Sequence, residues 1–359
     1  MSNGDLISTC VKIGSSRVGL GEEAYIIAEL SGNHLGKLDN AIELLRAAKN
    51  ARANAAKLQT YTADSMTIDS DADIFKLPET SLWKGYTYYQ LYKEAATPAE
   101  WLPKLKKEAV RLGIDLISSP FDNEAVRILD ELDFPALKIA SFEVVDLKLI
   151  QSAASTGRPV IISTGMATLA EVDAAVNAAR SVGDGGIILL YASSAYPAPT
   201  SDMALRTIPH MIKTWNLPVG LSDHTQGIHA AVAAVALGAN VIEKHLTLRR
   251  SDGGPDAEFS MEPDEFKKLV SSVREVESTL TRVRYGPSPG EIVSLNFRRS
   301  LFVVKDMEAG EKFSEQNVRS IRPGYGLPPK EWNQIEGRVA RGAIKRGTPL
   351  QWDLVGDIG

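Results

Sequence analysis

The hydrophobic and polar positions of the chain alternate between two patterns from about residue 25 to about residue 281. Short apolar runs typical of buried strands are each followed by a longer segment with apolar residues at helical spacing. The predicted strands are 25–30, 55–60, 115–119, 136–139, 159–163, 187–191, 219–221 and 241–245. The predicted helices are 38–53, 99–112, 123–132, 146–155, 169–182, 203–215, 228–237 and 263–281. Eight strand–helix pairs over about 260 residues predict an α/β fold, a (β/α)8 TIM barrel.

The structural alternative to the barrel is a doubly wound open sheet, which has the same alternation of strands and helices. No Gly-x-Gly-x-x-Gly turn follows the first strand, however, and the count of eight favours closure. Residues 1–24 are expected to form a lead-in with a hairpin that plugs the bottom of the barrel. Residues 61–98 form a long insertion after the second strand, rich in Asp and aromatic residues. A lid over the barrel mouth is one interpretation of this insertion.

The alternation ends at residues 284–290, where two prolines and two glycines indicate a linker. Short strand-like runs separated by turns follow, among them 300–304 and 338–340. The last part of the chain is therefore predicted to be a small, mostly β module. The predicted organisation is a barrel domain at 1–283, a linker at 284–297 and a C-terminal domain at 298–359.

The composition narrows the class of protein. The net charge is −5 and no basic stripe stands out, which argues against nucleic acid as a partner. No stretch approaches the roughly 20 apolar residues of a membrane span, and the first residues lack the pattern of a signal peptide. The single cysteine, Cys10, cannot form an intramolecular disulfide. We therefore expect a cytoplasmic protein without a membrane partner.

Polar side chains gather at the C-terminal ends of the predicted strands, where TIM barrels carry their active sites. A strand end also becomes polar simply because it leaves the core, so each residue alone is a weak signal. Eight ends that meet at one mouth are a stronger signal. The set is Glu29, Lys57, Gln59, Ser118, Ser119, Lys138, Ser141, Glu143, Ser163, Thr164, Ser193, Ser194, Ser222, His224, Glu243 and His245.

Two histidines, His224 and His245, end consecutive predicted strands that a single helix connects. A strand–helix–strand unit places the two strands in parallel, with both ends at the same edge of the sheet. Two imidazoles side by side, with Asp223 and Glu243 nearby, can hold a divalent metal in an open site. The alternative, core histidines bonded to the backbone, is disfavoured by these matched positions. The other three histidines, His34, His210 and His229, are interpreted as structural. For His34, a supporting position behind the site residues is left open.

Two lysines, Lys57 and Lys138, lie within strands that are otherwise apolar. A buried lysine requires a carboxylate or an anionic ligand, because burial of an unpaired charge is very costly. Pairing with Glu29 or Glu143 is one interpretation. A phosphate group on a small substrate is favoured, since two lysines and several hydroxyls converge without a P-loop. The sequence leaves a Schiff-base lysine open.

Nine short motifs occur in an order and spacing that resemble the sialic acid synthase family, whose members join phosphoenolpyruvate to an amino sugar. The resemblance covers nearly the whole chain, and the tail from about residue 298, including 321–324, resembles the antifreeze-like (SAF) domain of that family. The motifs are Ile27-Ala-Glu-Leu-Ser-Gly-Asn-His34, Lys57-Leu-Gln-Thr60, Ser118-Ser-Pro-Phe121, Lys138-Ile-Ala-Ser-Phe-Glu143, Ser163-Thr-Gly-Met166, Tyr196-Pro-Ala-Pro199, Gly220-Leu-Ser-Asp-His-Thr225, Ile242-Glu-Lys-His245 and Gly254-Pro-Asp256.

The resemblance also bears on the sugar. Phe142 and two segments of the insertion, 61–68 and 82–92, are most similar to the branch that forms pseudaminic acid from 2,4-diacetamido-2,4,6-trideoxy-L-altrose. Ser194 stands where relatives of the N-acetylneuraminate type carry Asn, which disfavours N-acetylmannosamine as the substrate. Formation of N-acetylneuraminate or legionaminate is the alternative. More distant alternatives are a metal-dependent aldolase and a carbohydrate- or ice-binding module on an inactive barrel.

The resemblance assigns roles to the predicted site residues. It implies that His224 and His245 bind Mn(II), or Mg(II) or Co(II) in its place. Glu29 and Glu143 are the acid–base candidates, with Glu143 favoured for assisting ring opening of the sugar or protonating the forming hydroxyl. The resemblance further implies a domain-swapped homodimer in which Arg322 reaches the barrel mouth of the neighbouring subunit. The phosphate and carboxylate would be held by Lys57, Lys138, Ser141, Ser163, Ser194 and Ser222. The remaining substrate contacts would come from Gln59, Ser119, Phe121, Tyr196 and Asp256.

Overall fold

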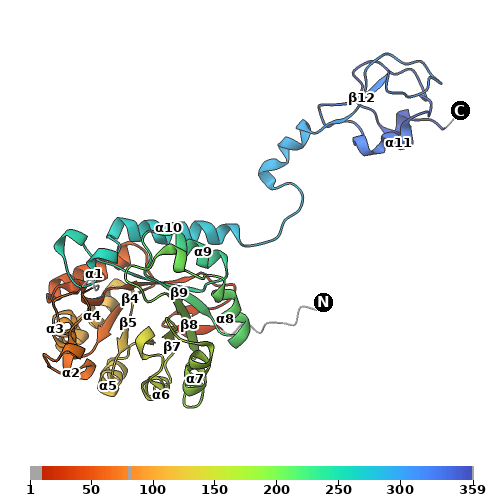
Figure 1. The fold of residues 1–359 in the computed structure, drawn as a ribbon. Helices are drawn as coiled ribbons and strands as arrows, with labels where there is room; N and C mark the ends of the chain where they lie inside the picture. The colour runs from red at the N-terminus through yellow and green to blue at the C-terminus, as the bar shows by residue number, and fades with distance from the viewer. Residues whose placement is uncertain (1–9, 80–82, 358–359) are drawn as a thin grey trace. The chain divides into compact units, whose positions relative to one another are not determined.

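The computed structural model describes residues 10–79 and 83–357. The chain divides into two compact units, one that ends at Thr281 and one that begins at Arg282. The first unit is a barrel of strands surrounded by helices (Figure 1). Its eight parallel strands form a closed barrel, in which β10 pairs with β3. The strands are β3 (Tyr25–Glu29), β4 (Ala55–Thr60), β5 (Asp115–Pro120), β6 (Leu137–Ile139), β7 (Val160–Ser163), β8 (Ile187–Ala192), β9 (Val219–Asp223) and β10 (Val241–His245). The predicted (β/α)8 barrel is confirmed.

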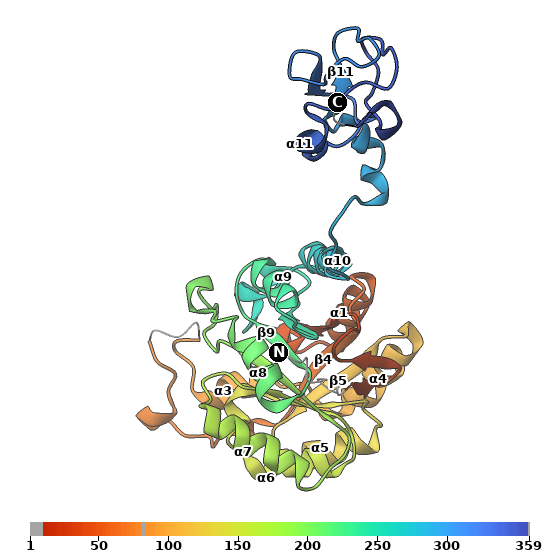
Figure 2. The ribbon, with the colours of Figure 1, turned by 90° about the vertical axis from the view of Figure 1, so that its right-hand side faces the viewer.

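Helices surround the strands (Figure 2). Within the described residues of the first unit, eight of them each follow the strand that the sequence pattern places before them. Their ends follow local chemistry. Thr168 and Glu171 form a capping box at the start of α7, and α4 ends where Gly113 adopts a positive φ of 65°. The helices are α1 (Leu38–Asn50), α4 (Leu102–Leu112), α5 (Asn123–Glu131), α6 (Leu147–Ser155), α7 (Leu169–Arg180), α8 (Thr207–Trp215), α9 (His229–Ala236) and α10 (Pro263–Thr279).

The barrel wall separates two hydrophobic cores, because successive residues of a strand face opposite sides. One core lies between the wall and the helices, and includes Ile26, Ala56, Leu116, Leu137, Ile162, Leu189, Leu221 and Ile242. The other fills the lower interior, and includes Tyr25, Ile27, Ala55, Ile117, Ile161, Ile188, Leu190 and Val241. The strands β1 (Val11–Ile13) and β2 (Ser16–Val18) form a hairpin whose apolar side chains join this inner core. The predicted plug is confirmed for the described part of the lead-in, residues 10–24.

The insertion after β4 folds into short helices, and part of its aromatic motif, residue 82, lies outside the described residues. It contains α2 (Ala63–Met66), a 3-10 turn (Asp73–Phe75), α3 (Tyr88–Ala95) and a second 3-10 turn (Ala99–Trp101). The Trp83 indole Nε1 donates to the Pro255 carbonyl at 2.6 Å, and its ring centroid lies 6.4 Å from that of Tyr196. The insertion therefore contacts the loop that follows β10.

The second unit has a core of its own, which includes Leu301, Val303, Phe313, Ile335 and Leu350. Strand β11 (Ser300–Val303) pairs antiparallel with β12 (Val318–Ile321), and α11 spans Trp332–Ile335. The predicted strand at 338–340 is wrong, because these residues form only single bridges, Lys312 to Val339 and Ala340 to Val355. None of the helices in the described parts of the chain is long and apolar enough to cross a membrane.

Candidate active site

Four buried charged side chains form an ion-pair network inside the barrel, above the inner core. Lys57 Nζ lies 2.6 Å from Glu29 Oε2 and 3.1 Å from Glu243 Oε1. Lys138 Nζ lies 3.4 Å from the same Glu243 oxygen, so Lys138 pairs with Glu243 and not with Glu143. No more than 5% of any of these four side chains is exposed. The two cations and two anions balance each other before any ligand enters.

The network changes the acidity of its members. Burial lowers the pKa of Lys57 to about 7, although the Glu243 carboxylate opposes this change. Burial would raise the pKa of Glu243, but Lys138 and Lys57 outweigh burial and hold that pKa well below its usual range. An anionic ligand beside Lys57 would favour its charged form. An anion that enters therefore meets a network whose charges already cancel once Lys57 is protonated.

Serine hydroxyls line the same mouth. Ser222 Oγ donates to Glu243 Oε1 at 3.0 Å, and Ser119 Oγ lies 3.5 Å from Lys57 Nζ. The Ser163 and Ser194 hydroxyls are buried and have no hydrogen-bond partner within residues 10–79 and 83–357. Buried hydroxyls without a partner are uncommon, and a bound ligand would satisfy them. Together with the lysines they form a set of donors for a phosphate or carboxylate.

Gly165, which sequence reasoning did not single out, allows two of these serines to approach each other. Its N–H lies 3.3 Å from Ser141 Oγ, which accepts its hydrogen bond. A Cβ at this position would lie 2.1 Å from Ser194 Oγ and 2.7 Å from Ser141 Oγ. Only glycine leaves both hydroxyls where they are. Its position in the sequence, two residues after the strand-end residue Ser163, could have indicated that it lies at the mouth.

The two predicted metal ligands face each other, with ring centroids 5.5 Å apart. His224 Nδ1 donates to the Ser193 carbonyl at 2.9 Å, so its proton is on Nδ1 and its Nε2 carries a lone pair. His245 Nδ1 is buried, has no hydrogen-bond partner among the described residues and lies 3.9 Å from Asp256 Oδ2. Burial lowers the pKa of His224 to about 4 and that of His245 well below its ordinary value, so both rings are neutral at neutral pH.

Neutral imidazoles with free ring nitrogens fit a divalent metal. In the parts of the chain that the structure describes, no three His, Cys, Asp or Glu side chains gather closely enough to complete a metal site. The histidine pair would therefore supply two ligands, and water or substrate would supply the others.

Aromatic side chains form the remaining wall of the mouth. The ring centroids of Tyr196 and His224 lie 4.5 Å apart. The ring centroid of Phe259 lies 4.9 Å from that of His245 and 5.3 Å from that of Tyr196. Phe259 was not among the predicted site residues, because it lies in a 3-10 turn (Ala257–Phe259) far from any strand end. On another side Tyr61 contacts Phe121 edge to face, with centroids 5.2 Å apart. These rings provide apolar surface beside the polar donors.

The two predicted acid–base groups have different surroundings. Glu29 Oε1 accepts from the Ser31 N–H at 2.8 Å and from Gln59 Nε2 at 3.4 Å, which stabilises its carboxylate form. Glu143 lies in a 3-10 turn (Ser141–Glu143), and its Oε2 is buried without a partner among the described residues. Burial raises the pKa of Glu143, although Lys138 opposes this. Glu143 is therefore better suited than Glu29 to carry a proton.

Not every predicted residue lies in the mouth. Ser118 faces the helix layer and bonds to Thr60 Oγ1 at 2.8 Å, because it alternates with Ser119 along β5. The Thr164 hydroxyl donates to the Leu190 carbonyl at 3.2 Å. His34 is buried beside α1, where Nδ1 accepts from the Gly36 N–H at 3.1 Å. Arg322 belongs to the second unit.

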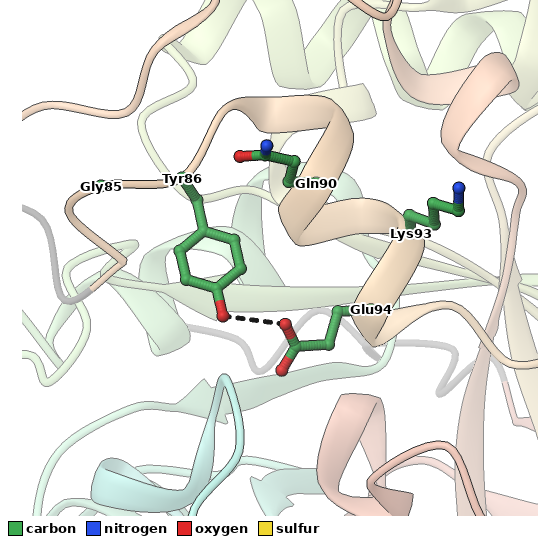
Figure 3. A pocket seen from close by; sticks show the side chains of 5 residues that line it. All are labelled: Gly85, Tyr86, Gln90, Lys93 and Glu94. Atoms are coloured by element: carbon green, nitrogen blue, oxygen red, sulfur yellow. Dashed lines mark hydrogen bonds between the residues drawn. The ribbon is translucent and has the colours of Figure 1, made fainter.

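The insertion also carries a hollow of about 460 Å³ (Figure 3). No predicted site residue lines it, and Tyr86 Oη donates to Glu94 Oε2 at 2.9 Å across it. It is lined by Gly85, Tyr86, Gln90, Lys93 and Glu94.

Comparison with known proteins agrees with the fold and the motifs. The model of the NeuB family matches residues 44–285, and that of the SAF domain matches residues 298–356. The chain is 41% identical over 330 residues to the pseudaminic acid synthase of Campylobacter jejuni, covering 92% of this chain and 96% of that protein. It is 36% identical over 337 residues to the N,N'-diacetyllegionaminic acid synthase of Legionella pneumophila, with coverage of 92% and 94%. The solved structure of an N-acetylneuraminic acid synthetase from Leptospira borgpetersenii has a TM-score of 0.72 at 30% identity, and the match covers 81% of this chain and 96% of that one.

The substitution Gly165→Ala should disturb the mouth without unfolding the barrel. The added methyl group displaces the hydroxyls of Ser141 and Ser194, each of which is worth about 1.5–3 kcal/mol when it bonds a charged ligand. We expect inorganic phosphate to bind about tenfold more weakly or worse by calorimetry, with little change in the melting temperature. Ala167→Gly, in the same loop, is the control. Unchanged phosphate affinity in Gly165→Ala would show that the two hydroxyls do not bind the anion.

His34 should make stability depend on pH. Burial lowers its pKa from 6.5 to about 4. Between these two pH values His34 is protonated in the unfolded chain and neutral in the folded chain. Stability should therefore fall as pH falls from 6.5 towards 4, by about 3 kcal/mol at most. Urea unfolding of the wild type and His34→Asn at several pH values measures this slope, which should be smaller in the variant. His210→Asn, on the exposed face of α8, is the matched control. An equal dependence of stability on pH in all three proteins would show that His34 is not its source.

Proposed function

The chain belongs to the NeuB family, and on that premise we propose that it catalyses the pseudaminic acid synthase reaction. Phosphoenolpyruvate, 2,4-diacetamido-2,4,6-trideoxy-L-altrose in its open-chain form and water would give pseudaminic acid and phosphate. The observation that carries this proposal is the 41% identity to the Campylobacter jejuni enzyme over nearly the full length of both proteins. The lower identity to the legionaminic acid synthase, 36%, favours pseudaminic acid over the alternative product.

The anion-binding side of the mouth would hold phosphoenolpyruvate. Lys57 and Lys138 are the buried cations, and Ser163 and Ser194 offer hydroxyls that lack partners among the described residues. Arrival of an anion stabilises the charged form of Lys57, whose pKa burial lowers to about 7. Ser141 and Ser222 complete the set of donors. Fixed donors of this kind orient the substrate and stabilise developing charge without covalent catalysis.

The opposite side of the mouth would hold the sugar. His224 and His245, both neutral, would bind a divalent metal such as Mn(II), which supplies Lewis-acid polarisation of the sugar aldehyde when bound. C3 of phosphoenolpyruvate then forms a bond to the aldehyde carbon, water adds at C2, and phosphate leaves with cleavage of the C–O bond. Gln59, Tyr196 and Asp256 would line the sugar. Ser119 and Phe121 would bound the space between the two substrates.

Glu143 is our choice for the group that protonates the forming hydroxyl or assists ring opening. Its raised pKa keeps a proton available nearer to neutral pH than an exposed carboxyl would. Glu29 pairs with Lys57 and accepts a hydrogen bond from Gln59. Glu143 would therefore act as the acid, and Glu29 would act as a fixed anion beside Lys57.

We also propose that two chains form a homodimer in which the second unit of each covers the barrel mouth of the other. Large apolar side chains are exposed along the linker, among them Tyr285 at 95%, Val293 at 72% and Phe297 at 66%. Others are exposed at the barrel rim, among them Phe142 at 59% and Met166 at 64%. A partner chain would bury both sets. Arg322 would then contribute a positive charge to the partner's mouth, where the described charges balance.

The reaction is tested by incubating the protein with phosphoenolpyruvate, Mn(II) and a panel of amino sugars, and by measuring phosphate release and product mass. We expect kcat/KM to be at least tenfold higher for 2,4-diacetamido-2,4,6-trideoxy-L-altrose than for N-acetylmannosamine. His224→Ala should remain folded and lose metal-dependent turnover. Product formed from pyruvate would indicate an aldolase instead. Sugar binding without turnover would indicate a binding module.

The shared site is tested by co-expressing Arg322→Ala chains with Lys57→Ala chains. Each homodimer should be inactive, while the mixed dimer should regain one working site, because one barrel keeps Lys57 and receives Arg322 from its partner. Arg319→Ala, exposed on β12, serves as the control and should remain active on its own. Absence of activity in the mixed dimer would argue against Arg322 acting between subunits.

A further inference from the structure

A second buried ion pair lies directly behind the two histidines, on the outer side of the barrel wall. Lys244 Nζ lies 2.8 Å from Asp223 Oδ2, and no more than 1% of either side chain is exposed. Each residue immediately precedes one of the histidines, and Lys244 and Asp223 are paired neighbours in the β9–β10 ladder. Their side chains point away from the mouth, because Ile242 and Leu221, two residues earlier, belong to the outer core. The reaction described above does not use this pair.

The hydrogen bonds of the pair extend into the loop after β9. Lys244 Nζ also donates to the Thr225 carbonyl at 2.5 Å. Asp223 Oδ1 accepts from the Thr225 N–H at 2.9 Å and from its hydroxyl at 2.8 Å. The ammonium and the carboxylate thus hold Thr225, immediately after His224, while Asp223, immediately before it, lies in the β9–β10 ladder. His224, placed between two anchored neighbours, directs its ring into the mouth.

We propose that Lys244 and Asp223 form a clamp that sets the separation and orientation of the two imidazoles and thereby the affinity for the metal. The clamp rests on the proposed function only in that the histidines hold a divalent ion. It joins β9 to β10 across their ends, one residue before each ligand. It also keeps His224 close enough to the Ser193 carbonyl to fix the proton on Nδ1 and leave Nε2 free. Lys244 and Asp223 are positioning residues, since neither reaches the mouth.

The clamp is tested with two variants and a control. Lys244→Met leaves the Asp223 carboxylate buried without its counterion, so this variant should be markedly less stable. The double variant Lys244→Met with Asp223→Asn removes both charges, keeps an acceptor for Thr225 and should recover most of the stability. Tyr25→Phe is the control, because it removes a partly buried hydrogen bond to Asp115 (2.7 Å) at the opposite end of the barrel.

Binding of Mn(II) alone, followed by electron paramagnetic resonance, is the first measurement. Loss of a group that orients a metal ligand typically weakens the affinity for the metal about 10–100-fold. We expect that loss in both clamp variants, including the double variant that has recovered its stability, and no loss in Tyr25→Phe. Affinity within twofold of the wild type in the double variant, or affinity that returns together with stability, would overturn the clamp.

Nitrogen-15 NMR of histidine-labelled protein without metal is the second measurement. The wild type should show His224 with its proton on Nδ1, and the clamp variants should show a mixture of the two neutral forms. If the wild type binds no Mn(II), the proposed metal role fails, and the imidazole signals alone decide on the clamp. Unchanged His224 signals in both variants would then overturn it.

Discussion

The balance of charge inside a closed barrel constrains everything around the mouth. Lys57 and Lys138 are buried among strands, where an unpaired ammonium would be too costly to keep. Glu243 lies between them and Glu29 lies on the far side of Lys57, so the four charges cancel within one network. Any anion that enters must either find further positive charge or loosen these pairs. Under the proposed function, a metal on the histidines and an arginine from a partner chain would be two sources of such charge.

The barrel wall makes this arrangement possible because its inward-facing side chains form the site while its outward-facing side chains pack against the helices. Inward-facing residues of the strands are apolar near the hairpin plug and polar near the mouth. Outward-facing residues pack against the helices along most of the wall. The Lys244–Asp223 pair is an exception, a charged contact in the outer layer. It lies one residue before each of the two histidines, behind the imidazoles.

The sequence by itself determined the fold and most of the set of residues at the mouth. Strand and helix periods differ, and their eightfold alternation specifies a closed barrel whose strand ends meet at one edge. Because side chains alternate along a strand, the positions of Glu29, Lys57 and Lys138 at strand ends already implied a common interior. These inferences depend on local periodicity, which a single chain displays directly.

Only the tertiary structure decided which of these groups touch. Glu243 rather than Glu143 pairs with Lys138, because the curvature of the barrel brings β10 opposite β6 across the interior. Gly165 and Phe259 enter the site through loops whose paths no periodicity specifies, and Ser118 leaves it because one residue along β5 reverses the face. Distances and shared partners between side chains far apart in sequence arise from packing. The strand pattern lists the groups that can meet, and the closed barrel selects the pairs that do.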